Sequence, residues 1–97
     1  MASTSPGYGI TIRVEGSPAS QPVALATTVI TGAGATITAL DVVESLLERV
    51  VIDITCDTID SDHADEITAA ISANPELTVR KVSDRTFLLH LGGKIEI

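Results

Sequence analysis

Acid–base, metal or thiol chemistry would have to come from very few side chains in this sequence. The densest group is His63 with Asp60, Asp62 and Asp65, which are residue types that bind metal ions. Their spacing lacks the central glycine and the terminal glutamate of a calcium-binding loop. Acids and capping residues are also what the first turn of a helix favours. We therefore interpret this cluster as a helix start rather than a metal site.

The remaining candidates lack partners at a recognisable spacing. No acid or nucleophile is placed to work with His90, so a linker or interface role is favoured over a catalytic base. Cys56, the single cysteine, ends an apolar strand face and is interpreted as a small buried hydrophobe rather than a reactive thiol. Asp53 is ordinary surface if its strand face meets water, and needs a partner such as Arg13 if that face is covered. We predict no catalytic residue in this fragment.

These residues lie on elements in the order β-α-β-β-α-β. Ile10, Ile12 and Val14 alternate with polar residues, which predicts a half-buried strand over 8–15. Ser20 is predicted to cap a helix that has Pro22 in its first turn. The other expected features are a helix end at Gly32 and Gly34, strands over 35–43 and 49–57, a helix from Asp60 to Asn74, and a strand over 77–82.

This order predicts an α+β, ferredoxin-like βαββαβ fold, with a four-stranded antiparallel sheet and both helices on one face. The link between the second and third strands is short, so these strands should be antiparallel. Leu46 and Leu47 fall in that link, where adjacent leucines would be exposed. Two interpretations stay open, because the leucines either extend a strand or pack on a partner subunit. The uncharged first helix and the sheet edges are candidate dimer surfaces.

Composition and charge narrow the class of protein. A length of 97 residues with 44% hydrophobic residues suits one domain with one core. The net charge is −7, and residues 41–76 alone hold ten acids against one base. Nucleic acids and anionic membranes are not expected partners, because they bind clustered Lys and Arg. No apolar run approaches the ~18 residues of a membrane span. The lack of a signal peptide and the lone cysteine favour a cytoplasmic protein.

The two ends of the sequence differ from its middle. Residues 1–7 are predicted to be a disordered leader, and residues 8–82 to be the folded domain. Residues 83–97 add a second apolar segment after the fold has closed, and they finish in an alternating run. A domain usually finishes in a polar tail, so this pattern predicts a module cut from a longer polypeptide. Residues 83–97 would then be a linker and the start of the region that follows.

Three segments carry a resemblance to a known family. They are Ile37–Glu44 (ITALDVVE), Val51–Cys56 (VIDITC) and Val82–Ile97 (VSDRTFLLHLGGKIEI). With the element order, they resemble the ACT domain, a small ligand-sensing module, as found at the N-terminus of some bacterial NAD-dependent malic enzymes. The last segment looks like the junction at which the catalytic region of such an enzyme begins. The resemblance covers residues 8–97.

The resemblance implies a regulatory domain that binds no cofactor itself. Its parent enzyme would use NAD and a divalent metal to decarboxylate malate oxidatively to pyruvate. ACT domains pair and bind small effectors at the interface. The resemblance therefore implies a homodimer, an amino acid or small carboxylate ligand, and contact with the malic enzyme catalytic region. The effector-binding residues that it implies are Gly16, Ser17, Ser20, Gln21, Thr36, Ile37 and Asp41.

One residue of the first loop keeps a second hypothesis open. The family often has a glycine just after a proline near the start of the first helix, whereas this chain has Gln21 followed by Pro22, with Gln21 at the matching position and the order disturbed. A constitutive assembly module that binds no small molecule is therefore the alternative. A small acyl-phosphate hydrolase on the same scaffold is set aside, because residues 16–21 lack an arginine to cradle a phosphate.

Overall fold

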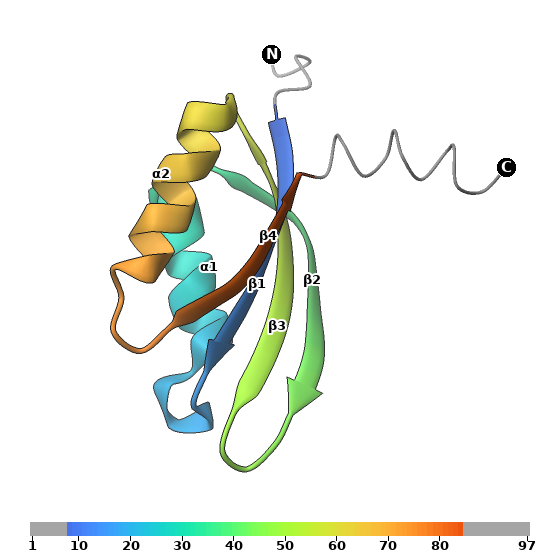
Figure 1. Ribbon diagram of the computed structural model, residues 1–97, viewed down its shortest axis with the longest axis vertical. Coiled ribbons are helices and arrows are strands. Elements are labelled where there is room, and N and C mark those ends of the chain that lie inside the picture. Colours follow the sequence, from blue (N-terminus) through green and yellow to red (C-terminus); the bar gives the residue numbers. More distant parts are fainter. Residues whose placement is uncertain (1–7, 85–97) are drawn as a thin grey trace, which may run out of the picture.

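The computed structural model describes residues 8–84, which form one sheet layer and one helix layer (Figure 1). The sheet order is β2-β3-β1-β4, and each neighbouring pair is antiparallel. The predicted α+β ferredoxin-like fold is thereby confirmed. The elements are β1 (Tyr8–Gly16), a short 3-10 turn η1 (Pro18–Ser20), α1 (Pro22–Gly32), β2 (Thr36–Ser45), β3 (Val50–Thr58), α2 (Ser61–Ser72) and β4 (Thr78–Asp84).

The core fills the space between the sheet and the two helices. The alternating residues of β1 stand opposite those of β3, so that Ile10 pairs with Cys56, Ile12 with Ile54 and Val14 with Ile52. Because alternate side chains share a face of a strand, these six residues make the middle of one face of this central pair apolar. Small and branched side chains of the helices complete the core, namely Ala26 and Ile30 of α1 and Ala64, Ile67 and Ile71 of α2.

Several element boundaries differ from the predicted ones. Ser20 does not cap α1, because Gln21 holds the cap position and the Ser20 hydroxyl donates to the Ser17 carbonyl. Strand β2 ends at Ser45, so neither Leu46 nor Leu47 extends the strand, and both lie in the hairpin loop. Strand β4 includes residues 83 and 84, which the sequence had assigned to the linker. The predicted leader, most of the predicted linker and His90 lie outside the described residues.

Both edge strands carry bulges. In β2 the pairing with β3 shifts between Ile37 and Ala39 and again between Val42 and Glu44. In β4 the pairing with β1 shifts opposite Arg13 and Val14, so Arg80 is the extra residue. A bulge interrupts the ladder of backbone groups that an edge would offer to another strand. Neither helix between residues 8 and 84 combines the length and apolarity needed to cross a membrane.

Candidate functional site

The first loop of the predicted effector site is a tight turn between β1 and α1. Gly16 ends β1, where a Cβ would come within 2.9 Å of the Pro22 Cβ and 3.1 Å of the Glu76 carbonyl oxygen. Only a glycine therefore fits under the start of α1 without displacing backbone. The turn is closed by the Ser20 backbone N–H and hydroxyl, which both donate to the Ser17 carbonyl, at 3.0 and 2.7 Å.

Gln21 links this turn to α1, since it follows the turn directly and is the N-cap residue of the helix. Its φ of 57° lies in the left-handed region, and it is the one non-glycine residue of the described chain with a positive φ. No side chain caps the N-terminus of α1, and its first turn contains no acidic residue. The first N–H groups of a helix carry partial positive charge and attract anions when no side chain satisfies them. This end of α1 is therefore suited to a carboxylate.

The second half of the predicted site lies elsewhere in the domain. Thr36, the first residue of β2, is paired across the sheet with Asp57 of β3, which is paired with Gly9 of β1. Gly16, the last residue of β1, is paired with Val50 of β3, which is paired with Ser45 of β2. These two rows of paired residues are seven residues apart along β1, or about 23 Å at the usual strand rise. The predicted residues of one chain are thus not brought together. Gly16, Ser17, Ser20 and Gln21 lie at one end of the sheet, and Thr36 and Ile37 lie at the other.

Ile37 and Asp41 lie on opposite sides of the sheet. Ile37 is opposite Cys56, and its half-buried side chain packs against the core. Asp41 is exposed opposite Asp53, on the face that no helix covers. A ligand held by one copy of the chain therefore cannot touch both residues from the same side.

The prediction of a helix start at Asp60–Asp62 is confirmed, and the side chain of His63 adds a contact that the sequence did not reveal. Asp60 accepts a hydrogen bond from the His63 backbone N–H at 2.8 Å. The imidazole Nδ1 accepts from the Ile59 N–H at 2.9 Å, and Nε2 lies 2.7 Å from the Ala33 carbonyl oxygen. A backbone N–H can only donate and a carbonyl can only accept, so the hydrogen is on Nε2. His63 thereby joins the end of α1 to the start of α2.

Gly34 makes this junction possible. Its φ of +92° turns the chain sharply after α1, so the predicted left-handed stop is confirmed at Gly34. The prediction is wrong for Gly32, which is the last residue of α1 and has no positive φ. A Cβ on Gly34 would lie 3.6 Å from His63 Nε2, so the turn brings the backbone directly over the ring. Within residues 8–84 no three His, Cys, Asp or Glu side chains are grouped to hold a metal ion. The geometry of His63 is that of a structural bridge between two backbone segments.

The open face of the sheet carries paired charges. Arg13 and Asp53 stand opposite each other and form two hydrogen bonds, with Nε 2.8 Å from Oδ1 and Nη2 2.9 Å from Oδ2. Asp53 is therefore both on the uncovered face and paired with Arg13. Hydrogen bonds and charge from Arg13 lower the pKa of Asp53 below its usual value and raise that of the guanidinium. Beside them, the hydroxyls of Thr11 and Thr55 are 2.9 Å apart.

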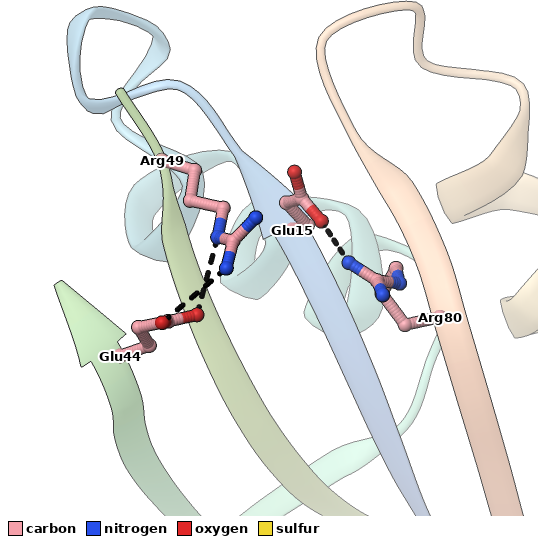
Figure 2. A network of polar contacts seen from close by, with 4 residues as sticks. All are labelled: Glu15, Glu44, Arg49 and Arg80. Carbon is pink, nitrogen blue, oxygen red and sulfur yellow. Dashed lines mark hydrogen bonds and ion pairs between the residues drawn. The ribbon is translucent and has the colours of Figure 1, made fainter. Parts of the chain in front are cut away.

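A second row of charges crosses the same face near the hairpin (Figure 2). Arg49 places Nε 3.1 Å and Nη2 3.3 Å from the two carboxylate oxygens of Glu44, which raises the pKa of Arg49. Glu15 pairs with Arg80, the bulged residue of β4. The sequence did not predict these pairs, because each joins residues whose proximity depends on strand register.

Cys56 is buried in the core, as predicted. Burial raises the pKa of its thiol to about 11. A thiolate is the nucleophilic form of cysteine, so this side chain is inert at neutral pH while the domain is folded.

Comparison with known proteins relates the chain to malic enzymes. No family model matches the sequence. The chain is 42% identical over 64 residues to an NAD-dependent malic enzyme of Geobacillus stearothermophilus. The match includes 66% of this chain but only 13% of that relative. The chain therefore spans a small part of the length of the protein it matches.

Proposed function

We propose that the chain is a regulatory, non-catalytic domain of an NAD-dependent malic enzyme, the ACT-like module that senses an effector for it. The observation that carries the proposal is the 42% identity to an enzyme of that name, confined to 13% of its length. The catalytic apparatus would lie in the remaining length of such an enzyme. NAD, the divalent metal and malate would bind there, and the parent would convert malate to pyruvate by oxidative decarboxylation.

The effector in this proposal is an amino acid or a small carboxylate. The uncapped N-terminus of α1 is the part of the described chain suited to its carboxylate, next to Ser17, Ser20 and Gln21. Thr36 and Ile37 join the site only if a second copy supplies them, since they lie at the other end of the sheet from residues 16–21 of the same chain. Asp41 lies on the opposite face from Ile37, so it does not join them there. The proposal therefore includes a homodimer with the effector between its subunits.

Regulation would follow from a difference in the affinity of the effector for two arrangements of the paired domains. An effector that binds one arrangement of the paired domains more tightly than another shifts the population toward it. The catalytic region attached to the domains then experiences that shift as a change in activity, with a coupling of typically about 1–3 kcal/mol. Which direction the activity changes depends on which arrangement the catalytic region favours.

A thermal-shift screen of the chain against amino acids and dicarboxylates tests the proposal. A ligand at about 100 times its Kd stabilises the folded state by about 2.7 kcal/mol, which for a domain of this size is a rise in Tm of roughly 10 °C or more. Gln21→Asp should abolish the rise, because its carboxylate would repel the ligand at the start of α1. Ser61→Asp adds the same charge at the start of α2 and should leave the rise intact.

The alternative is an assembly module without an effector. The observation that favours it is Gln21 itself, which occupies the left-handed position at which the resemblance implies glycine. A dimer whose Tm responds to none of the ligands would support this alternative and contradict effector sensing.

A further inference from the structure

The structure exposes a group of apolar side chains at the hairpin between β2 and β3. Within residues 8–84, seven large apolar side chains are exposed, and four of them lie between positions 42 and 47. We call these four, Val42, Val43, Leu46 and Leu47, the hairpin patch. Leu47 is 98% exposed. Exposed apolar side chains gathered within a few residues of a small protein can mark a region that binds another molecule.

The turn of the hairpin does not require leucine at its tip. The Leu46 N–H donates to the Arg49 carbonyl at 2.8 Å, which leaves Leu47 and Glu48 at the tip. Hairpin tips favour Gly, Asn and Asp, and neither tip residue is one of these. Val42 stands opposite the fully buried Ile52 on the helix-facing side, yet it is 55% exposed. The hairpin therefore extends beyond the part of the sheet that the helices cover.

Next to this hairpin lies a surface without charge. Residues 16–40, which comprise the first loop, α1 and the start of β2, contain no Asp, Glu, Lys, Arg or His, although the chain carries a net charge of −7. We call the exposed part of this segment the charge-free flank. It includes Val23, Ala24, Thr28, Thr31 and Thr36. A second, equally acidic copy meets no like charge from the residues of this segment themselves.

Pairing through the sheet edges is disfavoured by comparison. A two-fold contact between two β4 strands would place Arg80 and Lys81 near the same residues of the second copy. A two-fold contact along the whole of β2 would place Asp41 next to Asp41 of the second copy, and the two bulges of β2 interrupt the ladder. Like charges opposed across a contact destabilise it. Side chains, rather than a continuous backbone ladder, must therefore make the contact.

We propose that the hairpin patch binds a second copy of this chain by packing on the charge-free flank of that copy. In a two-fold arrangement with the subunits antiparallel, each hairpin lies beside the end of α1 and the start of β2 of the other subunit, so both patches are covered. The arrangement also brings residues 16–21 of one subunit toward Thr36 and Ile37 of the other. Only this approach of residues 16–21 to Thr36 and Ile37 rests on the proposed function, whereas the contact between the hairpin patch and the charge-free flank does not.

Sedimentation velocity over a concentration series, from about 1 μM to about 1 mM, tests the proposal on the chain as it is. The expected result is a monomer–dimer equilibrium that Leu47→Glu weakens at least about tenfold. Thr28→Glu, which places a charge on the flank, should weaken it as well. Ile59→Glu is the matched control, since Ile59 is 74% exposed outside the hairpin and the flank and the charge change is identical.

Each other outcome overturns the proposal. A monomer at every concentration means that a different molecule, if any, covers the hairpin patch. A dimer that Ile59→Glu weakens as much as Leu47→Glu has another interface or responds only to net charge. Circular dichroism of each variant checks that the fold is kept, which the exposure of all three positions favours. The ligand screen is read separately, so a monomer that binds an effector contradicts this interface without contradicting effector sensing.

Discussion

Substitutions of His63 should show how much each of its two side-chain hydrogen bonds contributes to the stability of the domain. Its ring accepts from the Ile59 N–H and donates to the Ala33 carbonyl, and its side chain is buried between them. His63→Leu keeps a similar volume and removes both hydrogen bonds. His63→Asn keeps an acceptor at the position of Nδ1, and His63→Gln keeps a donor near the position of Nε2. His63→Leu thus removes both contacts. His63→Asn removes only the contact to Ala33, and His63→Gln removes only the contact to Ile59.

The size of each effect follows from what is left behind. A buried backbone group that loses its partner costs about 1–3 kcal/mol. Both groups here are only partly buried, so water can reach them and the lower half of that range applies to each. We therefore expect His63→Leu to lower the free energy of unfolding by about 2–4 kcal/mol, and the Asn and Gln variants by about 1–2 kcal/mol each.

Urea unfolding followed by far-UV circular dichroism measures these differences, with the slope m compared between variants to confirm that the unfolded states are equivalent. The losses of the Asn and Gln variants should sum approximately to that of the Leu variant, because the two bonds involve separate backbone groups. A His63→Leu variant as stable as the wild type would refute the reasoning, since it would mean that the two bonds contribute nothing net.

Four further substitutions each change a single position. Gly16→Ala should lower the free energy of unfolding by about 1–3 kcal/mol, because its Cβ meets Pro22 and the Glu76 backbone. Gly32→Ala, where nothing lies within 4 Å, should instead raise it by roughly 0.5–1 kcal/mol, so equal effects in urea titrations would contradict this packing. Gln21→Gly should raise the Tm, since it relieves a left-handed conformation that costs about 1–2 kcal/mol for a residue with a Cβ. Because Arg13 lowers the pKa of Asp53 below 3.8, the stability from this pair is present above the unfolded pKa and is lost as pH falls through the folded pKa. The difference in stability between wild type and Asp53→Asn should therefore be constant from pH 7 to about 5 and shrink below pH 4, and a difference that grows on acidification would contradict it.

The sequence predicted the fold because its strongest signals are local. Alternation in β1 and the acids at the start of α2 act over a few residues, and both are where they were expected. The misplaced cap at Ser20 shows the limit of such signals. Its hydroxyl has two acceptable uses, capping the helix or closing the turn with Ser17, and the structure shows the second. Residue type alone does not distinguish between these two uses.

The candidate site was less predictable for the same physical reason. His63 gains its role from Ala33, thirty residues away, and no periodicity reports that Gly34 turns the chain over the imidazole. The bulges are equally hidden, although the one in β4 decides that Arg80 pairs with Glu15. The residues carried over by resemblance fall at two ends of the sheet, which only strand register could reveal.

The charged side chains on the open face of the sheet make that face unfavourable for an apolar partner. Across the open face, one row runs Asp41, Asp53, Arg13 and Lys81 from edge to edge, and the next row holds the pairs of Figure 2. Removing these charges from water on contact with an apolar partner would cost more than their mutual attraction returns. The opposite face is already covered by α1 and α2. A partner of low polarity is therefore directed away from the open face, toward uncharged surface such as the charge-free flank or the hairpin patch.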